Sequence, residues 1–289
     1  MSAAAPADAA FCADLVRNHD FDRYASTLFV DSAARRPLLA VYAFNVEISR
    51  VRDHVSQPLP GEIRLQWWSD MLEGAGHGGI EGTPVAAELL RAIRMYSLPI
   101  EPLSRLIEAH LFDLYNDPMP DLTTLEAYID DTTSTLFSLG ARVTGDLSEV
   151  TGHVAHHAGL AQGIARAIAA LPLDAARRQL FVPLQVLESH GSGMEEVFAC
   201  KTTPQLRRAL DQMIGAARGH LVTAFELLES APSAVRPIFL PLALVRHDLE
   251  QMSRTDLDLF NPPARSRLRT LWMLWRGSRA PVPRTQRSA

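Results

Sequence analysis

Apolar residues recur along most of this chain at the spacing of one face of an α-helix. No segment shows the alternation of apolar and polar positions that is typical of a half-buried strand. Stretches rich in proline and glycine, such as QPLP at 57–60 and GSG at 191–193, separate the periodic segments. The pattern predicts an all-α protein with helices at 9–17, 22–29, 32–55, 61–73, 84–96, 100–116, 122–144, 147–171, 182–188, 203–229, 234–252 and 264–276.

The distribution of these segments predicts one domain. The 289 residues are enough to bury a sizeable core in a single large unit. Low-complexity sequence is confined to the first ten residues and to the part after Gly277. We therefore expect a partly disordered N-terminal segment at 1–17, a domain at 18–277 and a basic flexible tail at 278–289.

Composition and charge narrow the class of protein. Hydrophobic residues make up 47% of the chain and the net charge is −5, so no general affinity for nucleic acid is expected. The two cysteines, Cys12 and Cys200, lack the spacing of a disulfide or metal motif, which favours a reduced cytoplasmic location. The first residues lack the charged and apolar regions of a secretory signal, and no apolar run is long enough to predict a membrane span.

One predicted helix carries a polar stripe on an otherwise apolar surface. Asn45, Ser49, Arg52 and Asp53 fall on the same helical face at the 3.6-residue period. Such a stripe would line a cavity or a wet groove. The alternative is a solvated helix end, because Asp53 lies just before the loop at Gln57.

Several longer phrases together resemble the squalene/phytoene synthase family, over roughly residues 21–276. These phrases are RPLLAVYAFNVEISRVRD, LPGEIRLQWWSDML, LTTLEAYIDDTTSTLFSLGARVTG, HHAGLAQGIARAIAALP, RRQLFVPLQVL and IFLPLALVRHDLEQM. The resemblance implies the isoprenoid-synthase-like fold, which is a single helical bundle around a central cavity.

The same resemblance implies a damaged diphosphate site. In the family, two facing helices each carry an Asp-x-x-x-Asp pair, and magnesium bridges these carboxylates to the substrate phosphates. The two pairs fall here on Ser49 with Asp53 and on Ala170 with Asp174, so each keeps only its second acid. Two lost charge-assisted contacts correspond to roughly 3–6 kcal/mol of binding or transition-state stabilisation.

If the site were active, the resemblance would assign Asp53 and Asp174 to magnesium. The substrate-binding positions would be Asn45, Ser49, Arg52, Asp53, Arg166, Ala170 and Asp174.

Local features of the second motif add two expectations. Pro172 should end its helix near Leu171 and leave Asp174 on a bend. Arg52 and Arg166 should face the old site and pair with Asp53 or Asp174, because acids left in a cavity without metal need partners. The alternative for Arg166 is an ordinary surface arginine.

The chain most resembles a divergent branch of the family that includes the mitochondrial complex I assembly factor and its bacterial relatives. That resemblance implies a non-catalytic assembly or interaction factor at the membrane face, with no cofactor and with a membrane-bound protein partner such as a complex I subunit. The alternative is an active prenyltransferase of isoprenoid biosynthesis, which condenses two isoprenyl diphosphates head-to-head with Mg²⁺. The half-lost acid pairs favour the first interpretation.

The predicted C-terminal helix has an apolar arc formed by Leu268, Leu271, Trp272 and Trp275. Arginines surround this arc and continue into the tail: Arg265, Arg267, Arg269, Arg276, Arg279, Arg284 and Arg287. Tryptophan and arginine around an apolar stripe suit a lipid interface, which predicts a weak peripheral contact with the inner membrane. The alternative is that the arc simply docks on the helical core.

Two polar clusters remain. His153, His156 and His157 have helical spacing but no further ligand nearby in sequence, so a zinc site is not predicted. The stretch TTST at 132–135 lies where family members place small residues toward the cavity, and its alternative is helix packing with hydroxyls bonded to the backbone.

Overall fold

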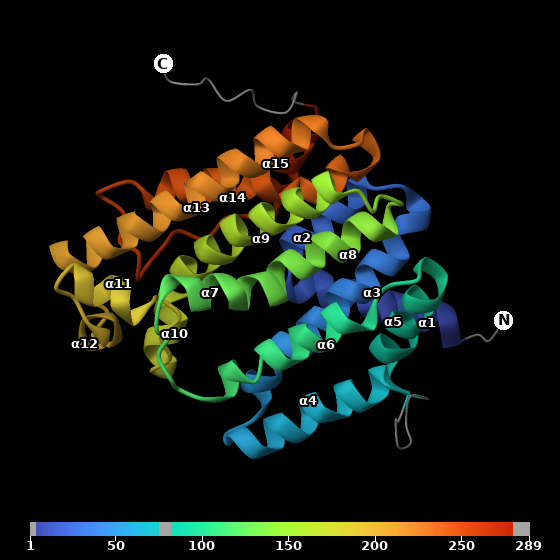
Figure 1. The fold of residues 1–289 in the computed structure, drawn as a ribbon, viewed down its shortest axis with the longest axis horizontal. Helices are drawn as coiled ribbons and strands as arrows, with labels where there is room; N and C mark the ends of the chain where they lie inside the picture. Colours follow the sequence, from blue (N-terminus) through green and yellow to red (C-terminus); the bar gives the residue numbers. More distant parts are fainter. Residues whose placement is uncertain (1–3, 75–81, 280–289) are drawn as a thin grey trace.

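The computed structural model describes residues 4–74 and 82–279, and these residues form helices connected by short loops (Figure 1). The α-helices are α1 Ala4–His19, α2 Phe21–Ser26, α3 Ser32–Ser49, α4 Pro58–Leu72, α5 Pro84–Tyr96, α6 Ile100–Ala109, α7 Leu122–Ile129, α8 Thr135–Val143, α9 Glu149–Ala169, α10 Leu171–Arg177, α11 Leu184–Ser189, α12 Met194–Phe198, α13 Pro204–Ser230, α14 Pro241–Met252 and α15 Arg267–Arg279. Short 3₁₀-helices lie at Thr27–Phe29, Val51–His54, Phe112–Leu114 and Ser233–Phe239, and a π-helical turn at Asp130–Ser134. Within these described ranges no strand occurs, so the all-α prediction is confirmed.

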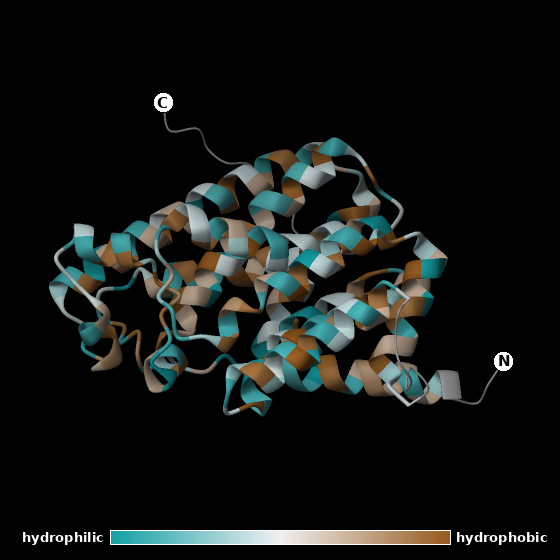
Figure 2. Cartoon of the chain, turned by 60° about the horizontal axis from the view of Figure 1, so that its bottom comes forward, coloured by the Kyte–Doolittle hydropathy of each residue, from teal (hydrophilic) through white to brown (hydrophobic). Residues whose placement is uncertain are grey.

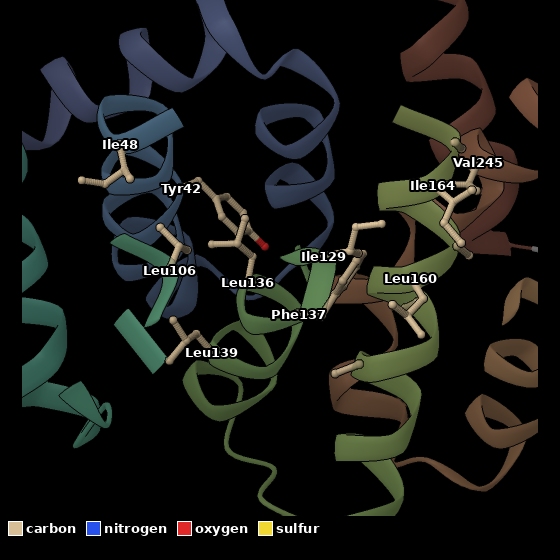
Figure 3. Close-up of a cluster of buried hydrophobic side chains, with 14 of the residues drawn as sticks. Tyr42, Ile48, Leu106, Ile129, Leu136, Phe137, Leu139, Leu160, Ile164 and Val245 are labelled. Atoms are coloured by element: carbon tan, nitrogen blue, oxygen red, sulfur yellow. The ribbon is translucent and has the colours of Figure 1, made fainter. Parts of the chain in front are cut away.

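The bundle is built around the long helices α9 and α13, which pack along each other (Figure 1). Helix α8 packs against both α9 and α3, and α3 also packs on α1 and α5. Helices from across the chain contribute to one apolar cluster, including Tyr42 of α3, Phe137 of α8, Ile164 of α9 and Val245 of α14 (Figure 3). Most helices carry both hydrophilic and hydrophobic residues (Figure 2).

The N-terminal segment differs from the prediction of a partly disordered 1–17. Helix α1 starts at Ala4, and Cys12 and Val16, four residues apart on one helical face, are buried against the bundle. Burial of this face explains why the segment is ordered as part of the domain. At the other end, α15 extends to Arg279, and the rest of the predicted tail lies outside the described residues.

Helix α3 is shorter than the predicted 32–55. It ends at Ser49, and a 3₁₀ turn at Val51–His54 follows, in which the Asp53 N–H donates to the Arg50 carbonyl at 3.0 Å. A 3₁₀ turn advances each residue by about 120° instead of 100°. Asp53 therefore leaves the face that Asn45 and Ser49 share.

The predicted helix at 122–144 contains a π turn. Asp130–Ser134 separates α7 from α8, and Thr132, Thr133 and Ser134 are buried there. One glycine of α9 crosses this segment closely: a Cβ at Gly159 would overlap the Ser134 backbone.

The first helix of the second motif ends close to the predicted Leu171, but Asp174 lies within a further short helix and not on a bend. Helix α9 ends at Ala169, and Pro172 lies in the first turn of the short helix α10. Asp174 is on α10, where its N–H donates to the Ala170 carbonyl at 2.9 Å. The sequence pattern missed α10 and α12 as separate elements because each is shorter than two full turns.

Candidate functional site

A cavity of about 580 Å³ lies between the end of α1, α2, α3, the α7–α8 segment, α9 and α10. Its apolar lining comes from Phe21, Val46, Leu125, Ile129, Leu136, Ala167 and Phe181, among others. Its polar lining falls into two clusters, one around Asp20 and one around Asp174.

The Asp20 cluster is an ion-paired network. Asp20 caps α2 and accepts hydrogen bonds from the Arg23 backbone N–H at 3.2 Å and from Arg23 Nη1 at 2.6 Å. Arg166 Nη2 lies 3.2 Å and 3.3 Å from the same carboxylate oxygens. Burial alone would raise the pKa of Asp20, but the charges of Arg166 and Arg23 outweigh it and lower the pKa to about 2.

Arg23 connects this network to α9. Its guanidinium is buried, donates to Gln162 Oε1 at 2.9 Å, and lies over the Tyr42 ring at 5.8 Å from the centroid. Burial, together with the charge of Arg166, lowers its pKa from the usual value. Asp20 thus already satisfies both arginines that face the cavity from α2 and α9.

The Asp174 cluster is not satisfied in this way. Asp174 is 5% exposed, and among the described residues none donates a hydrogen bond to its Oδ2. Burial is the main reason that its pKa rises to about 7; the charge of Asp113 adds to the rise, and Arg177 opposes it.

His110 and Tyr128 also line the cavity, and both contact Asp113. His110 Nδ1 lies 2.6 Å from Asp113 Oδ2, and Tyr128 donates to Asp113 Oδ1 at 2.9 Å. Burial, followed by the charge of Asp113, raises the pKa of Tyr128 well above its usual value. His110 Nε2 is buried and finds no hydrogen-bond partner within the described part of the chain.

The predicted site residues separate into two groups. Asn45, Ser49, Arg166, Ala170 and Asp174 all line the cavity. Arg52 and Asp53 lie beyond the described lining, because the 3₁₀ turn after α3 carries them away from it.

The expected arginine pairing was wrong. Arg166 pairs with Asp20, whereas Arg52 Nη1 donates to the Val55 carbonyl at 3.4 Å. Asp53 is paired by two other arginines, Arg177 at 2.8 Å and Arg50 at 3.5 Å. The sequence reasoning missed Asp20, Arg23, His110 and Tyr128, which are far from the motifs; only Gln162, a polar residue inside an apolar helix, offered a signal.

Comparison with known proteins identifies the family. A sequence model described as squalene/phytoene synthase matches residues 16–276. The chain belongs to the squalene/phytoene synthase family.

Among relatives, complex I assembly factor 6 of Mus musculus is 30% identical over 257 residues, covering 89% of this chain and 77% of that protein. Its homologue in Drosophila melanogaster is 31% identical over 258 residues, covering 85% and 75%. The crystal structure of squalene synthase HpnC from Alicyclobacillus acidocaldarius has a TM-score of 0.78 at 22% identity, covering 91% of this chain and 98% of that one. This structural likeness confirms the isoprenoid-synthase-like helical fold.

Asp53 and Asp174 are the acids that remain at the family's magnesium-binding positions. Magnesium prefers ionised carboxylates that can be held in octahedral geometry. Asp53 is ion-paired to Arg177 outside the cavity lining, and Asp174 is buried with a pKa of about 7. Across residues 4–74 and 82–279 no group of three or more His, Cys, Asp or Glu side chains has a metal-binding arrangement. The donor set therefore does not fit the family's magnesium cage.

The histidine cluster has partners of other kinds. His156 Nδ1 lies 2.7 Å from Asp130 Oδ1, and His157 Nδ1 lies 2.9 Å from His220 Nδ1. His220 also approaches Glu126 at 3.4 Å. These contacts connect α9 to α13 and to the α7–α8 segment, which is a packing role.

The threonine-rich stretch at 132–135 both lines the cavity and bonds its hydroxyls to the helix backbone, which are the two roles that its sequence allowed. Thr132 and Thr133 line the cavity, and Thr132 Oγ1 also donates to the Tyr128 carbonyl at 2.8 Å.

Proposed function

We propose that this protein is a non-catalytic member of its family that acts as an assembly factor for respiratory complex I at the membrane face. The observation that carries the proposal is the closed Asp20 network. A diphosphate site needs free cationic groups and metal-binding carboxylates, whereas here Arg23 and Arg166 are both already ion-paired with Asp20. The relatives that match most of the chain are named as complex I assembly factors, which supports complex I as the partner.

Rescue of a cell line that lacks the related factor tests this function. The chain, fused to a mitochondrial targeting sequence, would be expressed in mouse cells without complex I assembly factor 6. We expect recovery of assembled complex I on native gels and of NADH oxidation. Stable expression in mitochondria without any recovery would contradict the proposal.

An enzyme assay tests the competing prenyltransferase function. We expect incubation with farnesyl diphosphate and Mg²⁺ to release no pyrophosphate above a protein-free blank. Release that is abolished by EDTA and by Asp174→Asn would establish the prenyltransferase function instead.

The membrane-face part of the proposal is supported by α15. Leu268, Trp272 and Trp275 are 79%, 53% and 45% exposed, whereas Leu274 is buried against Ala25 and Leu244. The helix thus packs on the bundle through one side and leaves the side with the two tryptophans exposed. The alternative, in which the predicted apolar arc simply docks on the helical core, does not account for these exposed tryptophans.

Arginines surround this exposed side. Arg276 lies over Trp272 at 5.4 Å and Arg279 over Trp275 at 4.4 Å from the ring centroids. An apolar stripe bordered by arginine suits an anionic lipid surface. Arg284 and Arg287 of the tail lie outside the described residues. No helix in the described part of the chain has the length and apolar character needed to cross a membrane.

Flotation with anionic liposomes tests the α15 contact. We expect the intact chain to float, and the double variant Trp272→Gln with Trp275→Gln to lose most of this flotation. Met95→Gln is the matched control, because Met95 is 67% exposed on a different helix, α5. Equal flotation of all three proteins, or none at low salt, would contradict the membrane contact.

A further inference from the structure

Two residues of the cavity lining each have a buried polar atom that lacks a hydrogen bond. Asp174 Oδ2 and His110 Nε2 both belong to residues of the cavity lining, and neither finds a partner anywhere in residues 4–74 and 82–279. Leaving such a group unpaired destabilises the folded state. Two unpaired groups in the wall of one cavity point to a molecule that enters it.

The hydrogen-bond chemistry of this wall can be worked out from its geometry. Ionised Asp113 only accepts hydrogen bonds, so the hydrogen shared at 2.6 Å belongs to His110 Nδ1. In a neutral imidazole the other nitrogen, Nε2, then carries a lone pair. Asp174 Oδ2 is also an acceptor when ionised and becomes a donor when protonated. A hydroxyl group, which both donates and accepts, complements this pair.

The apolar part of the cavity lining indicates the chemical character of the rest of the ligand. Leu125, Ile129, Leu136 and Phe181 supply an apolar lining beside the polar wall. An apolar chain of modest length gains the usual hydrophobic free energy when it enters such a space.

The ion pairs that already occupy the arginines disfavour an anionic head. Arg23 and Arg166 already share the Asp20 carboxylate, and Arg50 lies 3.5 Å from Asp53. A phosphate would have to displace Asp20, which is buried and ionised, and would leave that carboxylate without its partners. An uncharged head needs no such exchange.

We propose that the cavity binds an uncharged amphiphile, an apolar chain that ends in a hydroxyl group, and that Asp174 and His110 hold the hydroxyl. This ligand is chemically distinct from the diphosphates of the family's enzymes. The site is independent of the complex I role, so either can fail without the other.

Matched ligands of one chain length test the proposal. Decan-1-ol and decyl phosphate would each be equilibrated with the intact protein by dialysis and quantified on both sides. We expect saturable binding of decan-1-ol, and binding of decyl phosphate at least about tenfold weaker, because the phosphate must break the Asp20 pairs. Equal or tighter binding of decyl phosphate, or no saturable binding of decan-1-ol, would overturn the proposal.

Variants locate the bound alcohol. Asp174→Leu and His110→Phe should each weaken decan-1-ol binding about tenfold, the usual value of one hydrogen bond to a ligand. Asp174→Asn, whose amide can still donate and accept, should retain most of the affinity. Asp211→Asn is the control, since Asp211 is exposed and paired with Arg207 on α13.

Two measurements keep the test decisive if a variant folds poorly. Thermal unfolding without ligand identifies any variant that has lost its fold, and only folded variants enter the comparison. A crystal structure with decan-1-ol should place the hydroxyl oxygen within hydrogen-bond distance of both Asp174 and His110. Ordered water alone at that position, or unchanged affinity in both folded variants, would refute the assignment.

Discussion

Asp20 and Asp174 line the same cavity and are both largely buried, yet their carboxyl groups behave in opposite ways. The pKa of Asp20 falls to about 2, whereas that of Asp174 rises to about 7. Burial pushes both upward, and the difference is that two guanidiniums within 3.3 Å surround Asp20. Asp174 has only the partial effect of Arg177, opposed by Asp113. The Asp20 carboxylate is therefore ion-paired and stabilises the folded state. The Asp174 carboxyl group has an unpaired oxygen and destabilises the folded state when it ionises.

Among the variants that test this comparison, removal of Arg23 should cause the largest loss of unfolding free energy. Arg23→Met leaves Asp20 with a single partner and Gln162 without its donor, so we expect a loss of about 3–5 kcal/mol in unfolding free energy. Urea unfolding at neutral pH measures it. A loss below about 1 kcal/mol would mean that Arg166 alone satisfies Asp20.

Asp174→Asn should instead stabilise the protein at alkaline pH. Because the folded pKa is about 7 and the ordinary value is 3.8, the folded state binds the extra proton between these values, and stability falls as pH rises through this window. The variant lacks this loss, so we expect it to be about 2–4 kcal/mol more stable at pH 8.5 and little different near pH 3.5. A variant that is less stable at pH 8.5 would show that Asp174 is satisfied when ionised.

Asp20→Asn should have the opposite sign and a smaller size. The folded pKa of about 2 lies below the ordinary 3.8, so Asp20 contributes stability above pH 3.8 and loses it as pH falls through 2. We expect the variant to be about 2 kcal/mol less stable at pH 7, with the difference shrinking under acid conditions. Unfolding midpoints across a pH series measure this; a constant difference at every pH would contradict the ion-pair explanation.

Arg177→Gln should have the smallest effect on stability. Its pair with Asp53 is partly exposed, so we expect a change below about 1 kcal/mol at pH 5. Arg177 also lowers the pKa of Asp174, so its removal should raise that pKa further; the loss of stability with rising pH should then become larger and continue to a higher pH. An unchanged pH profile would show that Arg177 does not act on Asp174.

The sequence was sufficient for the helical fold and for the family, because both depend on patterns spread over the whole chain. It also predicted that the helix before Asp174 ends next to Pro172, since the effect of proline is local, but it did not predict that Asp174 itself is helical. It placed Asp53 incorrectly on the face of Asn45 and Ser49, because the change from α-helix to 3₁₀ turn after Ser49 leaves no clear sequence signal.

The partners of the acids were beyond sequence reasoning. Asp20 and Arg166 are far apart in the chain and meet only through packing of α2 against the end of α9. Within the sequence, Asp20 and Arg23 look like an ordinary surface pair at i, i+3. That Asp174 Oδ2 is unpaired is likewise a property of the assembled wall.

The π turn between α7 and α8 fixes the number of residues that this segment must contain. A turn closed by i→i+5 hydrogen bonds holds one residue more than an α-helical turn. Each residue of an α-helix rotates its successors by about 100°. The extra residue within Asp130–Ser134 therefore sets the rotation of α8, and with it the side that Leu136 turns to the cavity. Deleting Thr132, Thr133 or Ser134 would change no charge, yet it would turn the whole face of α8 away from its neighbours, so this segment cannot vary in length as a surface loop can.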